Sequence, residues 1–307
     1  IMQDLGAIAR VRQICPTMPI HASTQMTIHT VQGALEAARL GIRRVVAARE
    51  LSCKELETLC GTGMEIEVFC HGALCMAVSG KCYLSLNNTG HSANRGECLQ
   101  LCRRSYTVRD RETGTELDID NKYVMSPKDL KTIRFLDRMI RAGVRVFKIE
   151  GRARGAEYVD TVVRCYDEAL GAVLDGTFTE ERKDEWDARL ARVFNRGFWD
   201  GYYQGQTMGE WNDRPGSRAT ERKVYVGRGV RYYTKLQVAE FKIEAATLSV
   251  GDRILITGPT TGALEAEVRE IRYDLQPVQT ARQGQRVSIP IDRKVRASDK
   301  LFKLERK

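Results

Sequence analysis

Several features of secreted and membrane proteins are missing from this sequence of 307 residues. No stretch approaches the roughly 18 consecutive apolar residues that a membrane-spanning helix requires. No charged segment followed by an apolar run opens the chain, as it would in a secretory leader. The sequence therefore predicts a soluble, cytoplasmic protein with no membrane partner. Residues 1–6 read like the end of a strand that runs into a helix, so we expect an N-terminally truncated chain.

Histidine is scarce, and the common hydrolase motifs are missing with it. The four histidines are His21, His29, His71 and His91. Neither H-E-x-x-H nor G-x-S-x-G occurs, which argues against the zinc-dependent and serine-dependent hydrolases that these motifs mark. A thiol nucleophile with a histidine base, such as Cys75 with His71, remains open.

Long basic runs are also missing, although the chain is basic as a whole. It has 49 Lys and Arg against 40 Asp and Glu, a net charge of +9 and a pI near 9.1. Such an excess favours polyanionic partners such as RNA, but many ordinary enzymes share it. Charge alone therefore leaves a nucleic-acid partner open.

Cysteine, by contrast, is plentiful, and five of the nine cysteines fall between residues 70 and 102. An odd count in a long, charged chain argues against a disulfide framework. Six residues separate Cys75 from Cys82, fifteen separate Cys82 from Cys98, and three separate Cys98 from Cys102. Four thiolates in one excursion of the chain suit zinc or an iron–sulfur cluster. Because no C-x2-C pair is present, the spacing favours a cluster, with buried reduced cysteines as the alternative. Residues 87–92, within the same excursion, form a polar loop with few apolar anchors, so we expect a bound metal to order it.

The other five cysteines are not assigned to this group. Cys70 is ambiguous, because it lies on a predicted strand five residues before Cys75. Four cysteines lie in helical patterns and are predicted to be packing residues: Cys15, Cys53, Cys60 and Cys165.

Strand-like and helical patterns alternate in the first half of the chain. The predicted strands are 19–23, 44–49, 64–71 and 144–150. The predicted helices are 30–40, 54–60, a third from 126 or 128 to 142, and 157–174. Repeated β/α units predict parallel strands covered by helices. We therefore expect an α/β fold, a partial TIM-like β/α barrel over residues 1–176, with a cysteine-rich insertion at about 70–105.

Polar residues follow each predicted strand. In a parallel barrel the carboxyl ends of the strands form the active face, so these side chains should converge. Solvated strand ends and helix caps are the alternative explanation for each residue alone. The residues are His21, Ser23, Gln25, Arg49, Glu50, His71, Lys148, Glu150 and Arg152.

The second half of the chain has a different pattern. Residues 177–220 are first helical and then aromatic and glycine-rich, which predicts a bridge. Beyond residue 221, six short strands predict a small β-barrel domain over 221–307. Its basic and aromatic residues suit phosphate contact and base stacking, or simply the solvated face of an amphipathic strand. They are Lys223, Tyr225, Arg228, Arg231, Tyr232, Tyr233, Lys235 and Lys242.

Four short strings make the sequence recognisable. Residues 67–75 read E-V-F-C-H-G-A-L-C, and residues 79–85 read S-G-K-C-Y-L-S. Further along, N-R-G-E-C-L-Q-L-C-R begins at Asn94, and F-K-I-E-G-R begins at Phe147. Together these strings resemble the signature of the peptidase U-32 family, first described as collagenase-like proteases. The resemblance runs from about His21 into the terminal β-domain.

The resemblance implies a function. Characterised relatives hydroxylate RNA, either a transfer-RNA wobble uridine with prephenate as a required metabolite or a ribosomal cytidine, and others hydroxylate a quinone precursor. These relatives carry a cysteine-ligated 4Fe-4S cluster. The implied activity is Fe–S-dependent RNA hydroxylation. Among its forms, the resemblance favours 5-hydroxylation of a tRNA wobble uridine with prephenate as co-substrate. The alternative is a collagenase-like peptidase of the same family. The implied partners are tRNA or rRNA, together with Fe–S assembly and electron-donor proteins.

Roles for single residues follow from the resemblance and from residue type. Matching the relatives implicates Cys75, Cys82 and Cys98 as metal ligands, with Cys102 as our choice for the fourth. Many relatives have a cysteine shortly after the Ser-x-Lys-Asp-Leu string, where this chain has Lys131, so the fourth ligand is open. For a carboxylated metabolite, charge and position favour Arg49, Arg104, Lys148 and Arg152. For acid–base or pairing roles they favour His21, Glu50, Glu67, His71 and Glu150.

Overall fold

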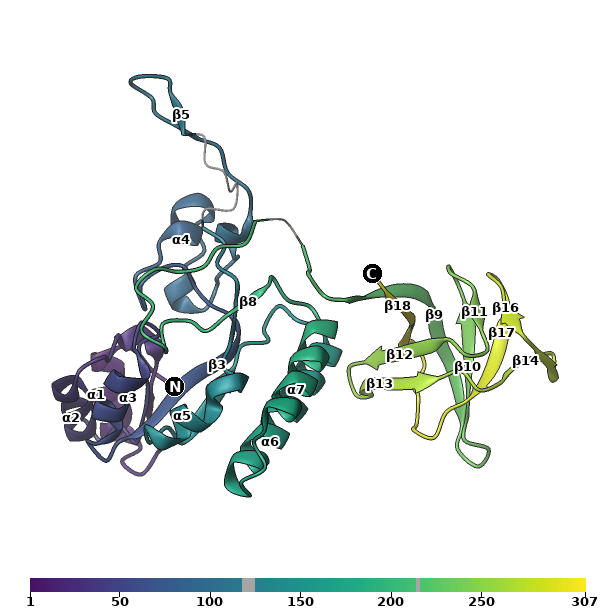
Figure 1. Ribbon diagram of the computed structural model, residues 1–307, viewed down its shortest axis with the longest axis horizontal. Helices are drawn as coiled ribbons and strands as arrows, with labels where there is room; N and C mark the ends of the chain where they lie inside the picture. Colours follow the sequence, from purple (N-terminus) through teal and green to yellow (C-terminus); the bar gives the residue numbers. More distant parts are fainter. Residues whose placement is uncertain (118–124, 214–215) are drawn as a thin grey trace. The chain divides into compact units, whose positions relative to one another are not determined.

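The computed structural model describes residues 1–117, 125–213 and 216–307 (Figure 1). The chain divides into two compact units. The first is Ile1–Arg152, Cys165–Asp187 and Asn195–Arg218, and the second is Ala153–Arg164, Ala188–Phe194 and Ala219–Lys307. The predicted bridge, residues 177–220, is thus shared between the units, and its residues 214 and 215 lie outside the described residues.

The first unit opens with helices that alternate with parallel strands. Asp4, Thr30 and Ser52 cap the first three helices, because each side chain accepts a hydrogen bond from a backbone N–H of the first turn. The predicted β/α order is confirmed over this stretch. The elements are α1 Leu5–Ile14, β1 His21–Ala22, α2 Val31–Arg39, β2 Arg44–Val46, α3 Cys53–Cys60 and β3 Glu65–Ala73.

Strand β3 is the longest of a six-stranded mixed sheet. Strands β2 and β7 run parallel to β3, β6 runs antiparallel to it, and β8 runs parallel to β6. The predicted parallel strands are confirmed. Among the described residues the recorded pairings do not close the sheet into a ring, so the barrel stays a prediction. The added strands are β6 Asp129–Lys131, β7 Val146–Ile149 and β8 Phe198–Trp199.

The helix predicted over residues 126–142 is wrong in its first half. Asp129–Lys131 form strand β6, a 3-10 turn follows at Ile133–Phe135, and helix α5 covers only Leu136–Arg141. The Asp129 side chain is fully buried and accepts a hydrogen bond from the backbone N–H of Arg196. Pairing with β3 and β8 overrides the local helical period here.

The core of the first unit lies between the sheet and its helices. Leu56 and Leu59 of α3 pack there with Ile66 of β3 and Met139 of α5, all of them at most 1% exposed. Cys53 and Cys60 pack against this core, and Cys70 and Cys165 are buried. Cys15, however, is exposed at the end of α1, so the packing role predicted for it is wrong.

Two longer helices follow, α6 Ala156–Leu174 and α7 Glu180–Arg192. They lie side by side in Figure 1, and the indole N–H of Trp186 donates to the Glu168 carboxylate over 3.0 Å. The helix predicted over 157–174 matches α6 to within one residue, and α7 lies where the bridge was predicted to be helical. No helix in the described part of the chain combines the length and the apolar character needed to cross a membrane.

The second unit contains an eight-stranded antiparallel sheet in the order β13-β12-β18-β9-β10-β17-β14-β15, with β11 and β16 forming a separate pair. Its core includes Val226, Phe241, Ile254 and Leu301, none of which is exposed. The sequence predicts six of these strands and misses the short ones, and closure into a barrel stays a prediction. The strands are β9 Glu221–Tyr233, β10 Val238–Ile243, β11 Leu248–Ser249, β12 Arg253–Gly258, β13 Gly262–Glu267, β14 Ile271–Tyr273, β15 Gln276–Val278, β16 Thr280–Ala281, β17 Arg286–Pro290 and β18 Lys300–Arg306.

Candidate functional site

A pocket of about 460 Å³ opens at the carboxyl ends of the parallel strands of the first unit. Gln25 follows β1, Arg49 follows β2, Leu74 follows β3 and Glu150 follows β7, and all four line it. The strand ends expected to converge therefore meet here. We call this space the cysteine pocket. The residues singled out from the sequence that line it are Gln25, Arg49, Cys75, Cys82, Cys98, Cys102, Lys148, Glu150 and Arg152.

The four thiols of the pocket lie close enough to influence one another. Burial raises the pKa of the Cys102 thiol to about 11, and the charge of Arg103 opposes that rise. Negative charge on Cys75, Cys98 and Cys82 raises this pKa further, so all three lie within electrostatic range of Cys102. Cys98 is exposed, and the other three are half-buried.

The segment that carries these cysteines contains only short elements, and side-chain hydrogen bonds hold it in place. The elements are helix α4 Leu84–Thr89 and two 3-10 turns, Ala93–Arg95 and Leu101–Arg103, and of the four cysteines only Cys102 lies within one of them. The Arg103 guanidinium donates to the carbonyl of Leu74 over 2.6 Å and also to the carbonyl of Pro127. Arg103 therefore ties the last cysteine-bearing turn to the end of β3. A small hairpin follows, β4 Val108–Arg109 and β5 Glu116–Leu117.

The tightest point of this loop is at Ser79 and Gly80. Ser79 is fully buried, and its carbonyl accepts a hydrogen bond from the Thr27 hydroxyl over 2.9 Å. Gly80 has a φ of +73°, and a Cβ atom there would lie 2.6 Å from the carbonyl oxygen of Gln25. Both the dihedral and the close approach require glycine, two residues before Cys82.

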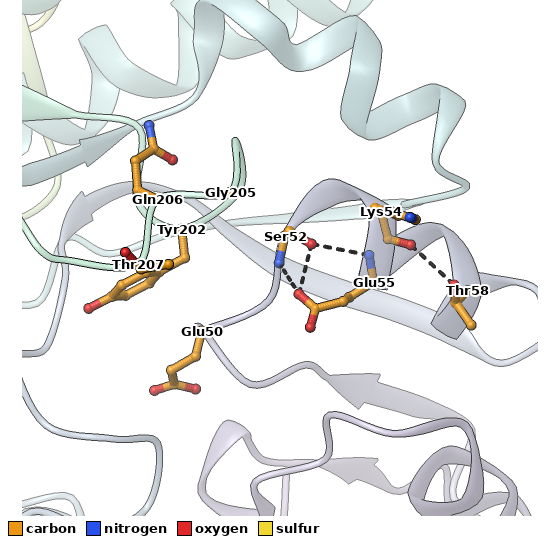
Figure 2. A pocket seen from close by; sticks show the side chains of 9 residues that line it. All are labelled: Glu50, Ser52, Lys54, Glu55, Thr58, Tyr202, Gly205, Gln206 and Thr207. Atoms are coloured by element: carbon orange, nitrogen blue, oxygen red, sulfur yellow. Dashed lines mark hydrogen bonds between the residues drawn. The ribbon is translucent and has the colours of Figure 1, made fainter.

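Arg49 and Glu50 are joined through Ser79. The Arg49 Nε donates to the Ser79 hydroxyl over 3.1 Å, and an Nη of Arg49 donates to the Ala77 carbonyl over 3.0 Å. Glu50 accepts from the backbone N–H of Ser79 over 2.8 Å. Glu50 also borders a neighbouring open pocket of about 810 Å³, beside Tyr202 (Figure 2). Arg49 thus lines the cysteine pocket, whereas Glu50 lines the neighbouring pocket and holds Ser79 by a hydrogen bond.

The other cations of the pocket are also held by carboxylates or carbonyls. Lys148 Nζ lies 3.1 Å from Glu67, whose buried carboxylate also lies 3.4 Å from Arg44 Nη1. Arg152 donates from its side chain to the Gly96 carbonyl over 3.1 Å. Arg49, Lys148 and Arg152 therefore line the same pocket as the four thiols.

The remaining candidates lie away from the pocket wall. His71 is 1% exposed, with Nδ1 3.3 Å from the Tyr166 hydroxyl. His21 begins β1 beside Arg44, at the other end of the parallel strands, and burial together with the charge of Arg44 lowers its pKa. Arg104 is exposed and is not among the lining residues.

Sequence reasoning missed Arg103, which lines the pocket next to Arg104. Its position immediately after Cys102 indicated a basic residue near the thiols. The sequence could not show which of the two adjacent arginines reaches the pocket, because that depends on the 3-10 turn Leu101–Arg103. Lys131, the departure from the relatives' pattern, forms an ion pair with Asp187 over 2.7 Å and lies 4.8 Å from the Phe198 ring centre.

The donor set decides which metal group fits. A single zinc ion holds each thiolate at about 2.3 Å, so its sulfur atoms must lie close together. Across residues 1–117, 125–213 and 216–307, no three His, Cys, Asp or Glu side chains are arranged to hold one ion. A four-iron cluster binds each thiolate through a different iron and so accepts wider spacing. Four cysteine thiols on the wall of one pocket are the ligand set that a four-iron cluster takes.

Comparison with known proteins identifies the family. The sequence pattern of peptidase family U32 matches residues 1–213. The chain belongs to peptidase family U32. The recognition drawn from the four strings is confirmed.

Relatives of this U32 chain carry two kinds of name. It is 61% identical over 317 residues to a Porphyromonas gingivalis protein named collagenase, across 100% of this chain and 86% of the relative. It is 31% identical over 265 residues to tRNA hydroxylation protein P1 of Bacillus subtilis, and the match covers 84% of this chain and 62% of the relative. It is 40% identical over 185 residues to the 23S rRNA 5-hydroxycytidine C2501 synthase of Escherichia coli, and that match covers 60% of this chain and 27% of the relative.

Proposed function

We propose that this chain is an Fe–S-dependent RNA hydroxylation enzyme whose 4Fe-4S cluster is held by Cys75, Cys82, Cys98 and Cys102. The convergence of these four thiols on one pocket carries the proposal. A bound cluster would supply one-electron redox chemistry at that place. The ion pair between Lys131 and Asp187 supports Cys102, rather than a group at position 131, as the fourth ligand.

The chain's own residues would bind and orient a small carboxylated co-substrate. Arg49 and Arg152 offer guanidinium donors, and Lys148 offers an ammonium, on the walls of the cysteine pocket. Guanidinium groups match carboxylates in a fork-like geometry, so a dicarboxylate such as prephenate suits this set. Glu150, on the same wall, is our candidate for moving a proton.

RNA as the substrate rests on relatives named for tRNA and rRNA hydroxylation. We favour a tRNA wobble uridine, hydroxylated at position 5, with Fe–S assembly and electron-donor proteins as further partners. We also propose that the parallel strands of the first unit belong to a TIM-like β/α barrel; the position of the cysteine pocket at their carboxyl ends, where such barrels have their active face, supports this.

A collagenase-like peptidase is the second candidate, supported by the collagenase that is 61% identical across the whole chain. A thiol peptidase needs a histidine base within hydrogen-bond reach of its nucleophile. None of the four histidines, all in the described part of the chain, is among the residues that line the cysteine pocket. The geometry therefore favours the redox proposal.

Iron and acid-labile sulfide should be measured per chain after anaerobic purification. We expect about four irons in the wild type and in Cys15→Ser, and a large loss in Cys82→Ser and Cys102→Ser. Cys15 is a matched control because it is exposed and outside the pocket. Hydroxylated uridine should then appear in tRNA from cells that express the wild type and not Cys82→Ser. A folded, iron-free wild type that cleaves gelatin would reject the proposal in favour of the peptidase.

A further inference from the structure

Four basic residues lie side by side across the antiparallel sheet of the second unit. Lys300 of β18 is opposite Arg228 of β9, and Arg228 is in turn opposite Lys242 of β10. Lys242 is also opposite Arg286 of β17. Residues directly opposite in an antiparallel pair project from the same face, with Cβ atoms about 4.5–5.5 Å apart. We call these four residues the cation row.

The cation row is on the solvent face of the sheet. Phe241 and Ile243, on either side of Lys242, are fully buried. Val287 and Leu301, which follow Arg286 and Lys300, are at most 1% exposed. Because side chains alternate between the two faces of a strand, the members of the row must point away from the core. Arg228, Arg286 and Lys300 are accordingly exposed.

Few negative charges face the row. Glu244 pairs with Arg228 over 3.0 Å and also accepts a hydrogen bond from the Tyr225 hydroxyl. Glu240 lies two residues before Lys242, on the same face, and is 3.3 Å from the Tyr233 hydroxyl. Within the described residues, the other three members of the row form no ion pair with a carboxylate. Four positive charges thus share one directly paired carboxylate.

Such an arrangement works against the stability of the sheet, because like charges directly opposite each other repel. A polyanion that places phosphates along the row would offset this repulsion. Three strand spacings of about 4.8 Å make the row about 14 Å long. Successive phosphates of one nucleic-acid strand follow at about 3.4 Å along a helix axis, so the row can meet several of them.

We propose that the cation row is an RNA-binding surface that contacts the phosphate backbone without reading the base sequence. The choice of RNA among polyanions rests on the proposed function. Of the basic residues noted in the sequence, Arg228 and Lys242 belong to the row, whereas Lys223 is paired with Glu157 over 2.6 Å. Phosphate contacts of this kind position a substrate and leave its recognition to other groups.

Binding of fluorescein-labelled oligouridine to the full chain tests the proposal by anisotropy at several salt concentrations. Each lost phosphate contact should weaken binding roughly fivefold at about 0.1 M salt and lower the salt slope by about 0.7. Lys242→Gln and Arg286→Gln should each show this loss, and the double variant twice the change in slope. Lys294→Gln, an exposed loop lysine outside the row, is the matched control and should bind like the wild type. The row variants should melt no lower than the wild type, since a repulsion is removed.

Wild-type affinity and salt slope in the double variant would overturn the proposal. So would row-dependent binding to phosphatidylserine vesicles by a chain that ignores oligouridine. Iron content and hydroxylated uridine, measured on the same preparations, test the proposed function separately from the cation row. If an iron-free chain binds oligouridine and the row variants weaken that binding, the row is supported and the proposed function is rejected. If iron content and hydroxylation are normal but the row variants bind oligouridine like the wild type, only the RNA-binding role of the row is rejected.

Discussion

Ser79 and Arg49 are thirty residues apart in sequence, yet the Ser79 hydroxyl accepts hydrogen bonds from both the backbone N–H and the Nε of Arg49. The same hydroxyl donates to Glu50 over 3.2 Å. This buried serine therefore fixes the direction of a pocket cation and anchors the loop that carries Cys82.

Ser79→Ala should lower the free energy of unfolding by about 1–3 kcal/mol, because it leaves buried partners without their hydrogen bonds. It should also lower iron content, since the loop loses its anchor. Urea unfolding and iron analysis measure the two effects. Ser288→Ala, on the solvent face of β17, is the control and should change neither. Equal stability of the two variants would contradict the role given to Ser79.

Gly80→Ala should destabilise the first unit by about 2 kcal/mol or more, because it adds a close contact with the Gln25 carbonyl to a left-handed backbone. Gly63→Ala separates the effect of the left-handed backbone from that of the close contact. Gly63 has a similar φ of +79° but open space around its Cβ position. If thermal unfolding shows the same loss of stability for both variants, the close contact at Gly80 does not contribute to the destabilisation.

Glu55 should make stability depend on pH. Hydrogen bonds from the backbone and then the side chain of Ser52 lower its pKa below the usual 4.5, within the capping box of α3 (Figure 2). A lowered folded-state pKa adds stability that is present above the unfolded value and lost as pH falls through the folded value. Glu55→Gln should therefore be less stable than the wild type at neutral pH and approach it in acid.

Urea unfolding at a series of pH values measures this difference. Glu57→Gln, on the same helix, is the control and should show no such pH-dependent gap, because the capping box does not include Glu57. A gap that stays constant as the pH falls well below 4.5 would mean that the Glu55 carboxylate does not act through its charge.

The sequence was sufficient wherever a local pattern determines the structure. The β/α rhythm placed α2, α3 and β3, and the spacing of the cysteines placed four thiols on one loop. It failed where partners distant in sequence decide. Residues 129–131 have a helical period but are paired by β3 and β8.

The same limit applies to the two basic features. Arg103 and Arg104 are identical neighbours in sequence, and only the 3-10 turn decides which one reaches Leu74. The members of the cation row come from four separate strands. Their alignment depends on strand register, including the shift between Glu240 and Phe241, which no local pattern records.

The hydrogen bond from Arg103 to Leu74 closes a loop between residues 29 apart. Holding the ends of such a loop together costs about 3 kcal/mol of chain entropy. In this protein contacts within the polypeptide, among them this hydrogen bond, offset the cost. If the proposed cluster binds at these thiols, less of its binding energy has to be spent on gathering them. Loss of Arg103 would then transfer that cost to the proposed cluster, and a higher supply of cluster would be needed to fill the site.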